Sequence, residues 1–211
     1  MTDNETLTRV FYDAVAEDYA EQFREDLVRP MERALLTGFA ELVGTDGEVA
    51  DLGCGPGRVT GHLAGLGLKV FGLDLSESML AVARRENPGL RFERGSMLAT
   101  GIPDGTLAGV VSRYSSIHTP VDQLPELFGE FHRVLRPGGH LFIAFQVGDV
   151  PRHYDEAWGR PVSIDFQRRR PEQIAALLEG AGFEMRSRTV RAAEEEEGES
   201  TPQAYLIARR P

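Results

Sequence analysis

An acid, a glycine turn and the start of a predicted helix follow one another in the run Asp51-Leu52-Gly53-Cys54-Gly55-Pro56-Gly57. An apolar segment, Glu48 to Leu52, leads into it and predicts a buried strand. Glycines allow positive φ angles and let a ligand approach without a Cβ in the way. The helix that follows presents free N–H groups at its first turn. This order of elements predicts a cofactor pocket at the end of the strand.

A second acid, Asp74, ends the next predicted strand, about 20 residues beyond the turn. A carboxylate at that point can accept hydrogen bonds from both ribose hydroxyls of a nucleoside. Asp51 can hold an ammonium group, whereas it would repel a pyrophosphate. These acids favour a nucleoside cofactor with an amino-acid portion, and a nicotinamide-dependent oxidoreductase is the less favoured alternative.

Strand and helix patterns alternate through the rest of the chain. Strands are predicted at Glu48–Leu52, Lys69–Leu73, Leu90–Arg94, Leu107–Arg113, His140–Phe145, Phe183–Val190 and Gln203–Ala208. Helices are predicted around Leu7–Phe23 and at Pro30–Val43, Val59–Leu66, Ser76–Arg85, Pro125–Leu135 and Pro171–Ala181. A short acidic loop joins the last two strands, so they should pair antiparallel. The expected fold is α/β and doubly wound: a mostly parallel seven-stranded sheet with one antiparallel strand from a C-terminal hairpin, and helices on both faces.

The glycine run resembles the first motif of the class I S-adenosylmethionine-dependent methyltransferases. Phe71 to Leu80 is similar to the segment that follows it in that family, and Phe131 to Gly139 resembles the family's helix and turn before strand five. The resemblance implies methyl transfer from S-adenosylmethionine, with S-adenosylhomocysteine as the product.

The resemblance also implies a set of cofactor-binding residues. Asp51, Gly53, Cys54 and Gly55 would surround the methionine part, and Asp74 would bind the ribose. The remaining predicted contacts are Tyr19, Leu75, Met79, Gly95, Ser96, Met97, Arg113 and Tyr114. Many relatives carry an aspartate at the position of Ser96, so its contact with the adenine is expected to be weaker or to pass through water.

Candidates for catalysis are His118, because histidine titrates near neutrality, and Tyr19, which would close over the cofactor. The structural alternative for His118 is a hydrogen-bonded histidine, and the alternative for Tyr19 is plain helix packing. The aromatic insertion Gln146 to Arg170 is expected to cover a partly apolar small molecule. No acid cluster resembles a magnesium site, so no metal is expected. O-methylation is slightly favoured, and a non-catalytic cofactor-binding module is the second alternative.

The 211 residues are expected to form one methyltransferase domain, with residues 1–43 as a cap, 44–145 as the cofactor-binding core, 146–170 as a lid and 171–211 as a helix plus hairpin. The net charge of −10 disfavours binding to nucleic acid or to an anionic membrane. The single cysteine excludes an intrachain disulfide. We expect a cytoplasmic monomer or homodimer that acts on a small-molecule acceptor.

Overall fold

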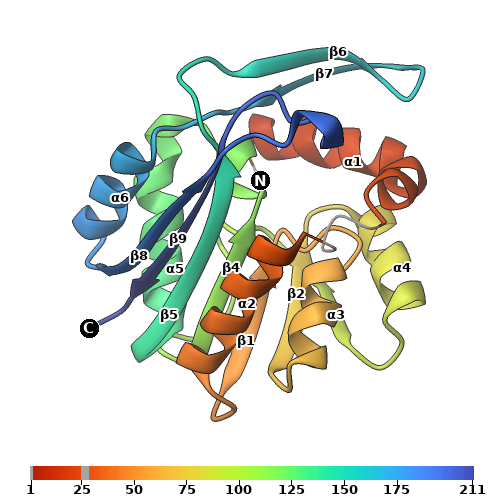
Figure 1. The fold of residues 1–211 in the computed structure, drawn as a ribbon. Helices are drawn as coiled ribbons and strands as arrows, with labels where there is room; N and C mark the ends of the chain where they lie inside the picture. The colour runs from red at the N-terminus through yellow and green to blue at the C-terminus, as the bar shows by residue number, and fades with distance from the viewer. Residues whose placement is uncertain (1, 25–28) are drawn as a thin grey trace.

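The computed structural model describes residues 2–24 and 29–211. Its centre is a seven-stranded sheet in the order β3-β2-β1-β4-β5-β9-β8 (Figure 1). The strands are β1 (Glu48–Leu52), β2 (Lys69–Asp74), β3 (Arg91–Arg94), β4 (Leu107–Arg113), β5 (Leu135–Gln146), β8 (Glu184–Arg191) and β9 (Gln203–Arg209). β9 pairs antiparallel with both β5 and β8, and the other pairs are parallel. The predicted sheet with one reversed strand is therefore confirmed.

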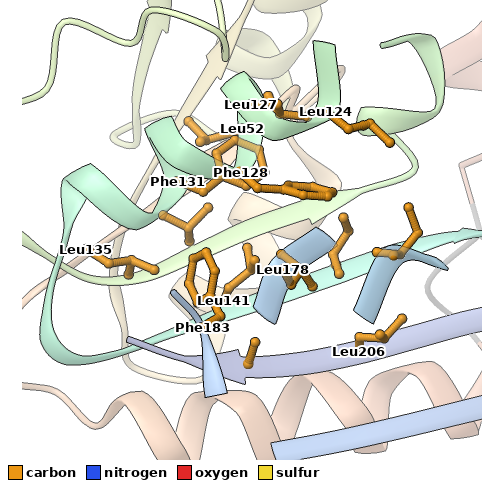
Figure 2. Close-up of a cluster of buried hydrophobic side chains, with 14 of the residues drawn as sticks. Leu52, Leu124, Leu127, Phe128, Phe131, Leu135, Leu141, Leu178, Phe183 and Leu206 are labelled. Atoms are coloured by element: carbon orange, nitrogen blue, oxygen red, sulfur yellow. The ribbon is translucent and has the colours of Figure 1, made fainter. Parts of the chain in front are cut away.

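Helices cover both faces of this sheet, because its central strands are apolar on both sides. α5 (Leu124–Val134) and α6 (Pro171–Gly180) pack on one face. Figure 2 shows part of that layer, in which Phe128 and Phe131 of α5 belong to the same buried cluster as Leu141 and Leu206 of the sheet. α2 (Pro30–Val43) and α3 (Arg58–Gly65) pack on the other face, and α4 (Glu77–Glu86) lies against β2 and β3.

The chain reverses its direction across the sheet between β1 and β4. β2 and β3 follow on one side of β1, whereas β4 and β5 lie on the other side. In open α/β sheets, ligands bind beyond the carboxyl ends of the strands at such a switch point. The fold therefore places the glycine turn after β1 at the edge where a cofactor is expected.

Two further elements lie over that edge. α1 (Asp3–Gln22) begins with a capping box, in which Thr2 and Glu5 satisfy each other's backbone N–H groups. β6 (Arg152–Ala157) and β7 (Arg160–Phe166) form a separate antiparallel hairpin that packs on α1 (Figure 1). The prediction from the sequence here was an insertion without strands. Most side chains of the hairpin are exposed, and the apolar alternation of Val162, Ile164 and Phe166 in β7 was missed.

The strand predicted at His140–Phe145 begins earlier than expected, at Leu135. Leu135 already pairs with Leu107, and a register shift follows before Gly109 pairs with His140. The turn signal Pro137-Gly138-Gly139 thus marks an irregularity at the start of β5. In the described ranges, no helix has the length and apolar character needed to cross a membrane.

Candidate functional site

A cleft lies at the carboxyl ends of β1, β2 and β4, beneath α1. It encloses about 1000 Å³ of empty space, open solvent included. The predicted residues on its wall are Tyr19, Asp51, Gly53, Cys54, Gly55, Asp74, Leu75, Met79, Gly95, Met97, Arg113, Tyr114 and His118. The structure therefore brings nearly all of the predicted site residues to one cleft, although they come from segments far apart in the chain.

The glycine turn adopts the backbone that its sequence demands. Gly53, Gly55 and Gly57 have φ angles of 74°, 53° and 78°, which favour glycine. A Cβ on Gly53 would lie 2.3 Å from the Cβ of Ser115, and one on Gly57 would lie 2.8 Å from the ring of Phe92. A Cβ on Gly55 would meet no protein atom within 4 Å. Gly53 and Gly57 thus serve close packing, whereas Gly55 leaves part of the cleft open.

Asp51 presents a carboxylate at the end of β1 and is only 2% exposed. One oxygen, Oδ2, accepts a hydrogen bond of 2.6 Å from the Thr60 hydroxyl. Burial raises the pKa of Asp51 from 3.8 to about 6, while Thr60 and Arg113 act in the opposite direction and Asp74 adds to the increase. A positively charged ligand beside Asp51 would relieve this unfavourable burial.

Asp74 presents a second carboxylate at the end of β2. Its two oxygens accept backbone N–H groups, Oδ2 from Gly55 at 2.8 Å and Oδ1 from Ser76 at 2.9 Å. Burial raises its pKa, and these two backbone bonds oppose the increase. Each carboxylate oxygen has a further lone pair, so Asp74 can hold the turn and still accept hydrogen bonds from a ligand.

Ser96 is the predicted cofactor residue that does not line the cleft. Its hydroxyl donates to the Glu5 carboxylate and accepts the N–H of Leu98 at 3.0 Å. Glu5 itself is buried and lies on the cleft wall. A carboxylate from α1 therefore stands beside Ser96, the residue predicted to contact the adenine. Sequence reasoning missed Glu5 because only the folded arrangement brings α1 beside Ser96.

His118 lies in a short 3-10 helix after β4 and faces α1. Its Nε2 is 2.8 Å from the Tyr12 hydroxyl. Burial lowers the pKa of His118 to about 4, an effect that the Asp165 backbone offsets only in part. Burial also raises the pKa of Tyr12 well above its ordinary value. At neutral pH the pair is therefore a neutral imidazole and a neutral phenol, joined by a hydrogen bond on the cleft wall.

Arg113 and Arg58 also lie on the cleft wall. Arg113 forms an ion pair with the fully buried Glu32 of α2, and its Nη2 donates to Glu32 Oε2 at 3.1 Å. Arg58, the first residue of α3, has Nε and Nη1 buried without a hydrogen-bond partner in the described part of the chain. Its guanidinium lies 5.4 Å from the centre of the Tyr19 ring. The sequence analysis did not include Arg58, although its place directly after Gly57 was a usable signal.

Comparisons with known proteins find methyltransferases. Residues 49–139 match a sequence model described as a methyltransferase domain. Over 136 residues, the chain is 32% identical to malonyl-[acyl-carrier protein] O-methyltransferase of Pectobacterium atrosepticum, covering 58% of this chain and 53% of that relative. Over 138 residues, it is 36% identical to trans-aconitate 2-methyltransferase of an Azoarcus strain, covering 63% of this chain and 48% of that relative. The chain thus spans about half the length of these curated relatives.

Similarity to solved structures extends over almost the whole fold. A structure of DhpI in complex with SAH superposes with a TM-score of 0.77 at 23% identity, covering 98% of this chain and 96% of that one. The alignment therefore includes the elements on both sides of the matched domain. Motifs, sheet order and sequence relatives agree: residues 49–139 match a methyltransferase domain, and the chain has the class I methyltransferase fold.

Proposed function

We propose that this chain binds S-adenosylmethionine in the cleft and transfers its methyl group to a hydroxyl group of a small molecule, without a metal ion. The observation that carries the proposal is the pair of carboxylates, Asp51 and Asp74, at adjacent strand ends in one cleft. Burial raises the pKa of both, so both gain from a ligand that brings an ammonium group and hydroxyl donors. S-adenosylmethionine carries both kinds of group.

The wall residues fit the parts of this cofactor. Asp51 is assigned to the ammonium group, and the unpaired guanidinium atoms of Arg58 are suited to the carboxylate of the same amino-acid portion. Asp74 is assigned to the ribose hydroxyls. Glu5 is assigned to the adenine amino group, since its carboxylate stands beside Ser96. Met79 and Met97 supply apolar surface for the adenosine.

When bound, the cofactor supplies an activated methyl group: an O–C bond to the acceptor forms as the S–C bond breaks, and the acceptor loses one proton. We assign that proton to Nε2 of His118, passed through the Tyr12 hydroxyl at 2.8 Å. Tyr12 accepts from the acceptor hydroxyl while it donates to the imidazole. The low pKa of His118 keeps the imidazole neutral at neutral pH, and in the tautomer that carries its proton on Nδ1 the Nε2 atom can accept the proton.

O-methylation is supported by this base and by the name of one relative, an O-methyltransferase. In the described ranges, no group of three His, Cys, Asp or Glu side chains is arranged to hold a metal. The test is incubation with cofactor carrying a deuterated methyl group, a metabolite extract and EDTA, followed by mass spectrometry. Labelled methyl ethers are expected. If labelled cofactor binds and no labelled product forms in any extract, the chain is a non-catalytic cofactor-binding module.

Replacing His118 with asparagine is expected to lower kcat about 100-fold or more, because a general base contributes roughly 10²–10⁴ in rate. Binding of S-adenosylhomocysteine should change less than about threefold, which calorimetry measures. Tyr12→Phe should lower kcat similarly, and the double variant should lose little more than either single variant, since both act in one relay. If His118→Asn leaves kcat unchanged, His118 is not the base, and the protein promotes methyl transfer by positioning the reactants alone.

The pH profile gives a separate check on His118. With a pKa of about 4, the imidazole stays neutral from pH 5 upward. Turnover by the wild type should therefore not fall between pH 7 and pH 5.5 on account of His118. A decrease centred near pH 6.5 that disappears in His118→Asn would mean that the histidine titrates as in solution.

Gly55→Ala is expected to weaken cofactor binding at least tenfold while the protein stays folded. Gly55 lines the cleft and has no protein atom within 4 Å of an added Cβ, so the methyl group would fill ligand space. Gly67→Ala is the matched control, since Gly67 also has positive φ and free space but lies outside the cleft wall. Both variants should lose about 1 kcal/mol of stability from backbone strain. Equal cofactor affinity in the two variants would contradict the assignment.

A further inference from the structure

A second cavity lies beside the cofactor cleft, between α1 and the β6–β7 hairpin. It encloses about 800 Å³ of empty space, open solvent included. The residues that line it, here called the aromatic chamber, are Phe11, Tyr19, Gln22, Phe23, Gln146, Tyr154, Glu156, Ala157, Trp158 and Phe166. Tyr19 belongs to the walls of both cavities. The aromatic chamber therefore adjoins the cofactor cleft at Tyr19.

The chemistry of the chamber wall is mainly aromatic. Tyr19 packs against Phe23 at 4.7 Å and against Trp158 at 6.2 Å between ring centres, and Phe166 packs against Tyr154 at 5.1 Å. Such ring edges and faces favour a flat ligand that stacks or meets them edge-on. Within the part of the chain that the structure describes, the lining residues include no arginine, lysine or histidine. Their one charged member, Glu156, is exposed and repels anions.

Trp158 is held in an unfavourable backbone conformation at the tip of the hairpin. Trp158 and Gly159 form the two-residue turn, with φ angles of 48° and 69°. Turns of this kind favour asparagine followed by glycine, and a bulky residue at positive φ is strained. Strain of this kind persists where a side chain is needed for another reason. The side chain of Trp158 contacts Tyr19 and lines the chamber, which supplies that reason.

We propose that the aromatic chamber is the acceptor site and that it takes a flat, uncharged aromatic compound of two or three rings bearing a hydroxyl group, with Trp158 as a specificity-determining contact. This inference rests on the proposed methyl transfer. The cavity volume of the chamber, about 320 Å³, lies at the lower end of the range of small-molecule sites, roughly 300–1,000 Å³, and is larger than a single ammonium group needs. The absence of a cationic lining residue separates this acceptor from the polycarboxylate named for one relative.

The experiment is calorimetry on the full chain saturated with S-adenosylhomocysteine, with three probes: 2-naphthol, benzyltrimethylammonium and tricarballylate. The wild type is expected to bind 2-naphthol at least tenfold more tightly than either other probe. Trp158→Asn should weaken 2-naphthol binding at least tenfold and raise the Tm by about 2–4 °C, since asparagine suits the turn. Trp158→Phe keeps an aromatic ring and the backbone strain at positive φ. This variant should therefore bind 2-naphthol within threefold of the wild type, with an unchanged Tm.

The outcomes separate this inference from the proposed function. If S-adenosylhomocysteine itself does not bind, the proposed function fails. If it binds and benzyltrimethylammonium or tricarballylate is preferred, the acceptor class is wrong. If Trp158→Asn lowers the Tm and leaves 2-naphthol binding unchanged, Trp158 serves the hairpin alone and the inference is overturned. Incubation with labelled cofactor and 2-naphthol should also give the labelled methyl ether, at a rate that falls in Trp158→Asn.

Discussion

The Asp74→Ala variant is expected to bind S-adenosylhomocysteine about 100-fold more weakly than the wild type. Two ribose hydroxyls would donate to this carboxylate, and each hydrogen bond to a charged group contributes about 1.5–3 kcal/mol. Even at the lower value, the loss is about 3 kcal/mol, or a factor of about 100 in affinity. Calorimetric titration of both proteins measures this difference directly.

Asp74 also holds the glycine turn through the N–H groups of Gly55 and Ser76, so a control is needed. Asp13→Ala supplies one, because Asp13 Oδ1 accepts a 2.6 Å hydrogen bond from the Ser76 hydroxyl but lies outside the cleft wall. This variant disturbs the same helix start and should bind the ligand within threefold of the wild type. Wild-type affinity in Asp74→Ala would mean that the ribose does not lie on Asp74.

The Asp51→Asn variant is expected to be more stable than the wild type without cofactor, and to bind the cofactor at least tenfold more weakly. Burial raises the pKa of Asp51 from 3.8 to about 6. A difference of about two units corresponds to roughly 3 kcal/mol of unfavourable free energy when the group is ionised at pH 7. An amide can still accept from Thr60, so the substitution removes the charge and keeps that hydrogen bond.

The pH dependence of this stability difference has a defined sign. Between pH 3.8 and about 6, the folded state holds a proton on Asp51 that the unfolded state has released. Stability of the wild type relative to the variant therefore falls as pH rises through this window and is constant above it. Denaturant unfolding at pH 4 and pH 7 measures the change. If Asp51→Asn were less stable at pH 7, the attraction of Arg113 and Thr60 would outweigh the burial.

Much of the fold was accessible from the sequence because its elements are marked locally. Apolar strands such as Leu107–Arg113 are buried on both faces, and Ser76 caps α4 as predicted, accepting the N–H of Met79. The β6–β7 hairpin was not predicted from the sequence. Its strands are mostly exposed, and its turn carries a tryptophan where the usual signal is asparagine.

The residues of the candidate site show the same difference between local sequence signals and contacts that only the fold creates. Asp51, Gly53 and Asp74 lie in continuous motifs at strand ends, and the sheet brings such ends together. The contacts made by α1 depend on how that helix crosses the sheet edge, which no local pattern encodes. For this reason Glu5 was missed, Ser96 was assigned a contact with the adenine, and the partnership of Tyr12 with His118 emerged only in the structure.

The most direct test of this account is a crystal structure of the chain with bound S-adenosylhomocysteine. We expect the amino group within hydrogen-bonding distance of Asp51, the ribose hydroxyls on Asp74, and the sulfur facing Tyr19, where the cofactor cleft meets the aromatic chamber. A ligand bound outside this cleft, or a sulfur atom turned away from Tyr19, would contradict the account.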